Sequence, residues 1–110
     1  MSGGRPELRV VLVTAPDPEC GERLARALVE ERLAACVNLV PGIRSFYRWE
    51  GRVQDDPEVL LVVKTQAGRA EALAARVQEL HPYELPEVLE LPVVGGSAAY
   101  LDWVFAESSS

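Results

Sequence analysis

The sequence predicts an α+β domain with a four-stranded antiparallel sheet, two crossover helices and one terminal helix. Short β-branched apolar runs alternate with segments of helical periodicity, in the order strand, helix, strand, strand, helix, strand, helix. The chain has 110 residues, enough for one hydrophobic core and too few for two. Right-handed crossovers in this order place the first and third strands in the centre, which is the ferredoxin-like arrangement.

The first strand and helix have clear local signals. Residues 8–14 are mostly apolar and β-branched, which favours a strand. Asp17 is a suitable N-cap and Pro18 suits the first helical position, so a helix is expected to begin there. Its expected buried face consists of two rows with a spacing of four: Cys20, Leu24 and Leu28, and Ala25, Val29 and Leu33.

A long hairpin follows. Residues 36–49 have β character that is interrupted at Pro41-Gly42, which indicates a bulge within one strand. Glu50-Gly51 is the expected turn, and residues 59–65 form the centre of the returning strand.

The last elements are punctuated by proline and glycine. His81-Pro82 ends a second helix that starts near Ala70, and residues 85–94 form a strand. Pro86 and Pro92 make this an edge strand, because proline cannot donate to a ladder. A short final helix is capped by Ser97 and is expected to bury Tyr100, Leu101 and Val104. Residues 8–105 therefore form the domain, with flexible tails at 1–7 and 106–110.

The two central strands are apolar on both faces. Residues 10–13 and 59–63 are continuous apolar runs, whereas a strand covered on one face should alternate. With no further helices to cover the second face, we expect a second copy of the chain to do so.

Composition excludes several classes of function. Eleven Lys and Arg against seventeen Asp and Glu give a net charge of -6, which argues against nucleic-acid binding. Apolar runs are too short for a membrane span, and residues 8–15 lack a signal-peptide cleavage site. Two cysteines suggest reduced thiols, so we expect a cytoplasmic protein.

Few residues could carry metal or covalent chemistry. Cys20, Cys36 and His81 are too few for a closed zinc site in one chain, although copper(I) or ligands shared around an oligomer axis remain open. A Cys36/His81 nucleophile pair is conceivable, but Cys36 lies among small apolar residues, where a thiol is usually a buried hydrophobe. No phosphate loop is present. We therefore expect a protein that is not an enzyme.

The segment 81–87 is the most informative part of the chain. His81 either binds carbonyls at its helix end or binds a ligand, and two prolines, Tyr83 and two carboxylates follow it. Tyr47 and Trp49 share one strand face and are expected to pack across the hairpin.

Several motifs together resemble the CutA divalent-cation tolerance proteins, over residues 10–103. They are ALVEERLAACVN at 27–38, YRWEG at 47–51, KT at 64–65, HPY at 81–83, PE at 86–87 and YLDW at 100–103. The resemblance implies a tight homotrimer, similar in architecture to the PII signal proteins, and a link to tolerance of copper and other divalent metals. The cleft residues that it implies are Cys36, Tyr47, Trp49, Lys64, His81, Tyr83 and Glu87. Some relatives carry a cysteine where this chain has Val13, and the resemblance assigns no role to Cys20.

Two functions remain open on this basis. The first is a non-enzymatic trimer that binds copper or another divalent metal through Cys36, His81 and Glu87, with no obligatory cofactor. The second is a small-molecule sensor or adaptor with clefts between subunits lined by Tyr47, Trp49, Lys64 and Tyr83, in which an organic anion binds near Lys64 and an unidentified protein receives the signal.

Overall fold

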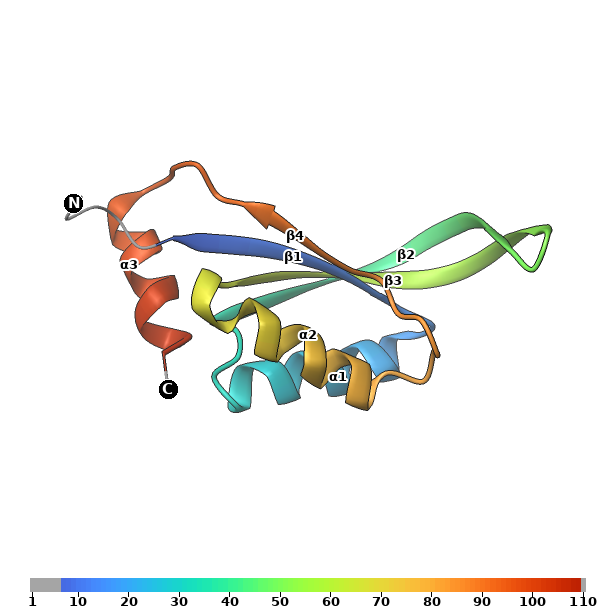
Figure 1. Ribbon diagram of the computed structural model, residues 1–110, viewed down its shortest axis with the longest axis horizontal. Coiled ribbons are helices and arrows are strands. Elements are labelled where there is room, and N and C mark those ends of the chain that lie inside the picture. Colours follow the sequence, from blue (N-terminus) through green and yellow to red (C-terminus); the bar gives the residue numbers. More distant parts are fainter. Residues whose placement is uncertain (1–6, 110) are drawn as a thin grey trace.

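The computed structural model describes residues 7–109 and confirms the predicted order of elements (Figure 1). The sheet has the order β2-β3-β1-β4, and all its pairings are antiparallel, so the first and third strands are central as expected. The elements are β1 (Leu8–Ala15), α1 (Pro18–Glu30), β2 (Cys36–Trp49), β3 (Arg52–Gln66), the 3₁₀ turn η1 (Ala67–Arg69), α2 (Ala70–Leu80), β4 (Val88–Pro92) and α3 (Ala98–Glu107). No helix within residues 7–109 is both long and apolar enough to cross a membrane.

Helix α1 begins as predicted and ends earlier than its apolar pattern. The Asp17 carboxylate accepts a hydrogen bond from the Cys20 amide at 2.8 Å. At the other end Arg32 has φ 58°, and the amides of Leu33 and Ala34 both donate to the Leu28 carbonyl. Leu33 is therefore buried outside the helix, and the expected burial of Val29 is wrong, since 41% of it is exposed.

The long hairpin contains both predicted irregularities. The pairing of β2 with β3 shifts between Val40 and Ile43, where Gly42 has φ 76°. Glu50 and Gly51 both have positive φ, as in a type I′ two-residue turn, whose backbone matches the right-handed twist of the strands on either side. The hairpin extends well beyond β1 and the helices (Figure 1), and the molecule measures 49 Å along its longest axis.

Helices α1 and α2 lie side by side on one face of the sheet (Figure 1). Between them and the sheet lies the main core, which includes Val11, Val13, Leu24, Leu28, Val59, Leu61, Val63, Leu73 and Val77. The opposite face, called here the open face, carries Val10, Leu12, Leu60, Val62, Leu89 and Leu91. Leu89 and Leu91 are exposed, so the expectation of an apolar second face holds for the chain.

Helix α3 covers only the end of the sheet near Leu8, where Leu101 and Val104 form a second small core. The predicted burial of Tyr100 with them is wrong, since 45% of the residue is exposed and its ring stacks on that of Trp103 along the helix surface. Strand β4 is an edge strand as predicted, but it starts only at Val88, and the segment before it is a loop.

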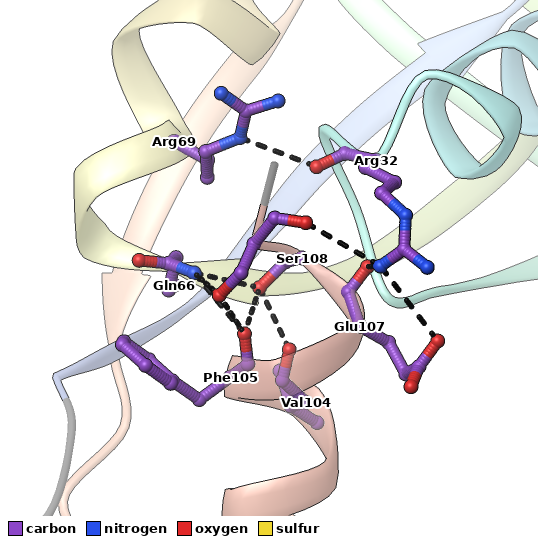
Figure 2. A network of polar contacts seen from close by, with 8 residues as sticks. Arg32, Gln66, Arg69, Val104, Phe105, Glu107 and Ser108 are labelled. Carbon is purple, nitrogen blue, oxygen red and sulfur yellow. Dashed lines mark hydrogen bonds and ion pairs between the residues drawn. The ribbon is translucent and has the colours of Figure 1, made fainter.

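Helix α3 continues to Glu107 and residues up to 109 contact the rest of the domain, whereas the sequence predicts a flexible tail from residue 106. Figure 2 shows Arg32, in the turn after α1, reaching the carbonyl and carboxylate of Glu107. Gln66 donates to the Phe105 carbonyl at 3.1 Å, and the fully buried Ser108 hydroxyl donates to the Val104 carbonyl at 2.7 Å. Residues 1–6 and 110, which were also assigned to tails, lie outside the described residues.

Close approach of α1 to the sheet depends on Gly21. A Cβ atom at this position would lie 2.6 Å from Leu39 Cδ1 and 2.9 Å from Val59 Cγ2. We expect Gly21→Ala to destabilise the protein by up to about 2 kcal/mol, because overpacking costs roughly 1–3 kcal/mol and the helical preference for alanine offsets about 1 kcal/mol of it. Thermal unfolding at fixed protein concentration would measure this. Gly68→Ala is the control, since its Cβ meets nothing closer than 3.6 Å. Equal melting temperatures for both variants would contradict the packing argument.

Candidate functional site

A cleft of about 920 Å³ lies between the hairpin and the loop that joins α2 to β4. Its walls come from three segments distant in sequence: the end of β1, the outer half of the hairpin and residues 82–87. The lining residues are Thr14, Ser45, Phe46, Tyr47, Trp49, Glu58, Pro82, Tyr83, Glu84, Leu85, Pro86 and Glu87. Residues 82–87 of the predicted corner 81–87 therefore line the cleft, as do Tyr47 and Trp49.

His81 fastens this loop to the sheet. Its Nε2 lies 2.7 Å from the Thr14 carbonyl oxygen, and its Nδ1 accepts a hydrogen bond from the Tyr83 amide at 3.1 Å. A neutral ring with its proton on Nε2 satisfies both contacts. The residue is 7% exposed, and its ring packs against that of Tyr83. Of the two hypotheses for His81, the structure shows carbonyl bonding, although the carbonyl belongs to β1. Both ring nitrogens are engaged, so neither is free for a metal.

Glu58 is the most unusual residue of the cleft. It is only 8% exposed, and its Oε2 accepts a hydrogen bond from the Tyr83 hydroxyl at 3.0 Å. Burial, together with this bond to Glu58, raises the pKa of Tyr83 above its usual value. Within residues 7–109 Glu58 makes no ion pair with lysine, arginine or histidine. A buried carboxylate without a cationic partner is costly, so this position favours a positive charge from outside the chain.

The rest of the cleft is also acidic. Burial, with a contribution from the negative charge of Glu58, raises the pKa of Glu87. The Tyr47 hydroxyl donates to Asp56 at 2.6 Å, and this bond raises the pKa of Tyr47. No lysine or arginine is among the lining residues. The cleft combines carboxylates with aromatic rings and has no positive charge of its own.

Two of the predicted site residues lie elsewhere in the subunit. Cys36 and Lys64 pair across β2 and β3, and Lys64 lies six residues from Glu58 along β3, a separation of about 20 Å. The Lys64 ammonium donates to the Asn38 side chain, and Lys64 lines a separate pocket of about 200 Å³ beside Tyr100. Cys36 is half-buried, which corrects the expectation of a buried hydrophobe.

The predicted metal ligands are thus not brought together in one subunit. Cys36 lies at one end of the open face, whereas His81 and Glu87 lie around the cleft at the other. The described part of the chain contains no group of three or more His, Cys, Asp and Glu side chains that could hold a metal ion. Cys20 is buried, and burial raises the pKa of its thiol. Any site that uses Cys36 with Glu87 requires more than one subunit.

Sequence reasoning missed Glu58. The available signal was its place directly before the apolar run of β3, in register with Leu60 and Val62, which put its side chain on the open face. The residue that buries it, Tyr83, is distant in sequence, and the pattern of β3 alone does not reveal that contact.

The raised pKa of Glu87 has a consequence for stability. The folded state holds this proton to a higher pH than the unfolded chain does, so ionisation of Glu87 costs stability at neutral pH. We expect Glu87→Gln to raise the melting temperature slightly at pH 7, and the gain to vanish on acidification, where the wild-type carboxyl is protonated in both states. Thermal unfolding in EDTA between pH 4 and 8 would measure it, with Glu22→Gln on the exposed side of α1 as control. A melting temperature lowered by Glu87→Gln at pH 7 would contradict the account.

Comparison with known proteins shows to which family the chain is similar. The family model described as "CutA1 divalent ion tolerance protein" matches residues 9–107. The chain is 54% identical over 95 residues to the divalent-cation tolerance protein CutA of Thermus thermophilus, covering 86% of this chain and 92% of that protein. It is 53% identical over 95 residues to the chloroplastic protein CutA of Arabidopsis thaliana, covering 86% of this chain and 52% of that longer protein.

Solved structures of CutA proteins have the same fold as the chain. The divalent cation tolerance protein from Thermus thermophilus superposes with a TM-score of 0.91 at 50% identity, covering 93% of this chain and 99% of that one. CutA1 from Oryza sativa has a TM-score of 0.92 at 47% identity, covering 96% of each chain. The chain therefore belongs to the CutA1 divalent ion tolerance protein family.

Proposed function

We propose that the protein acts in divalent-cation tolerance as a cytoplasmic homotrimer that binds cations, without catalysing a reaction, at clefts completed by neighbouring subunits. Family membership supports the link to cation tolerance. The observation that carries cation binding is Glu58, a buried carboxyl group with no cationic partner among the described residues, in a cleft that contains no lysine or arginine. The two unpaired cysteines suit a reducing compartment.

Assembly is supported by the apolar surface that the chain leaves uncovered. On the hairpin, Phe46, Trp49 and Val53 are exposed, and the open face adds Leu89 and Leu91. An apolar surface of this kind in a small protein usually marks an interface. The hairpin extends beyond its own sheet and could therefore reach a neighbouring subunit (Figure 1).

The donor set indicates how different metals would bind. Glu58 and Glu87 offer oxygen, which suits hard divalent cations such as Mn²⁺. Copper(I) favours a soft ligand such as a thiolate, and Cys36 lies too far from the cleft of its own subunit. We propose that copper binding draws on Cys36 from a second subunit, with Glu87 adding oxygen.

Titration calorimetry with Mn²⁺, with Zn²⁺ and, under anaerobic reducing conditions, with Cu⁺ tests this scheme. We expect Glu58→Gln to weaken binding of all three ions at least tenfold, and Cys36→Ser to weaken Cu⁺ binding without affecting Mn²⁺. Glu22→Gln is the charge-matched control, and every variant is checked for its oligomeric mass. Wild-type affinities in Glu58→Gln would contradict metal binding at the cleft, and wild-type Cu⁺ affinity in Cys36→Ser would exclude the thiol.

Trp49 should contribute to the assembly, because its indole is 44% exposed at the outer end of the hairpin, and aromatic residues often dominate interfaces. Light scattering coupled to size exclusion should give three times the chain mass of 12.0 kDa for the wild type, and a smaller average mass for Trp49→Ala at micromolar concentration. Trp103→Ala is the matched control, since that indole is equally exposed but stacks on Tyr100. A monomeric wild type would refute the trimer, and an unchanged Trp49→Ala assembly would refute the role of the indole.

A second candidate function is small-molecule sensing. It is favoured by the size of the cleft, about 920 Å³, which lies in the usual range for small-molecule sites, and by the aromatic rings that line it. Lys64 does not line the cleft of its own subunit, so one subunit offers no positive charge there for the organic anion expected from the sequence.

A further inference from the structure

We propose that the cleft binds an organic cation, a protonated amine on an apolar body, with the ammonium held by Glu58 and Glu87 and the body against Tyr47 and Tyr83. This inference rests on the second candidate function, that the cleft takes a small molecule, and it reverses the charge of the ligand expected from the sequence.

The charge of the cleft selects the sign of the ligand. Glu58, Glu84 and Glu87 line it, and no lysine or arginine does. Arg44, on the adjoining part of the hairpin, is held by Asp55 at 2.7 Å, with its guanidinium over the Phe46 ring. Within one subunit, an anion in the cleft would therefore meet negative charge without compensation, whereas a cation would relieve the repulsion between Glu58 and Glu87.

The hydrogen-bonding capacity of Glu58 also fits an ammonium group. Its Oε2 accepts from the Tyr83 hydroxyl, and the described residues supply no other hydrogen bond to this side chain. An ammonium has three donors and can bond to Glu58 while also reaching Glu87 at the rim. The ammonium would thus compensate the desolvation cost of the Glu58 carboxylate with a charge-assisted hydrogen bond, which the described residues of the chain do not supply.

The aromatic rings favour an organic body over a bare ion. Tyr47 is 40% exposed and lines the cleft with Tyr83. Cations bind to the faces of such rings, and apolar carbon packs against them. The described part of one subunit brings no three metal-binding side chains together, whereas a monovalent ammonium needs only one or two carboxylates. The volume of about 920 Å³ is far more than a single ion occupies.

Calorimetry with three probes that share a phenylethyl body isolates the charge. The native assembly is titrated at pH 7 with phenethylamine, which is protonated, with neutral 2-phenylethanol and with anionic 3-phenylpropionate. We expect phenethylamine to bind at least tenfold more tightly than either analogue, at one site per subunit. Glu58→Gln should lower the affinity for phenethylamine at least tenfold, and Glu22→Gln should leave it unchanged. If Glu58→Gln does not fold by circular dichroism, Glu87→Gln supplies the same comparison.

Several results would overturn the inference. One is 3-phenylpropionate or 2-phenylethanol binding as tightly as phenethylamine, and another is wild-type affinity in the carboxyl variant. A third is absence of amine binding together with a changed assembly mass for Glu58→Gln, which would assign the carboxyl to a contact with a second copy. Absence of amine binding with intact Glu58-dependent metal binding refutes the organic ligand and leaves cation tolerance standing. Amine binding without metal binding refutes direct metal binding and supports the inference.

Discussion

Coverage of only one face of the sheet is the constraint on which the rest of this molecule depends. Two helices lie on one face of strands that are apolar on both (Figure 1). Leu60 and Val62 are only half-buried on the open face, and their neighbours Leu89 and Leu91 are exposed. The hydrophobic effect therefore favours burial of this face against a partner, and the partner that we propose is a second copy of the chain.

The cleft is a consequence of the same layering. The chain must cross from the helical layer to β4 at the far side of β1, and it does so in the loop 82–87. His81 holds the start of this loop to the Thr14 carbonyl, while the Gln78 side chain donates to the carbonyl of Glu84 at 3.1 Å. The loop places Tyr83 over Glu58, which buries that carboxyl beside an uncovered hairpin. Its negative charge is thereby concentrated where a ligand or a neighbouring subunit can reach it.

The fold could be predicted from the sequence because its signals are local. The Asp17 cap, the interruption at Pro41-Gly42 and the turn at Glu50-Gly51 each act within a few residues, and crossover handedness then orders the strands. The predictions failed where contacts between residues distant in sequence determine the structure. Examples are the burial of Glu58 by Tyr83 and the contacts of the C-terminal segment with Arg32 and Gln66 (Figure 2). Motif matching grouped Lys64 with Tyr83. The contact between Tyr83 and Glu58, which lies six residues and roughly 20 Å along β3 from Lys64, separates the two within one subunit, and no pattern along the chain gives that contact.

The central claim, that other copies of the chain cover the open face, is tested most directly by hydroxyl-radical footprinting of the native protein in solution. In the isolated chain Leu89 and Leu91 are 55% and 45% exposed, while Val29 on the outer side of α1 is 41% exposed and serves as internal reference. The account predicts strong protection of Leu89 and Leu91 relative to Val29, and loss of that protection when dilution dissociates the assembly. Oxidation of both leucines at the rate expected from their exposure in one chain, unchanged by protein concentration, would contradict it.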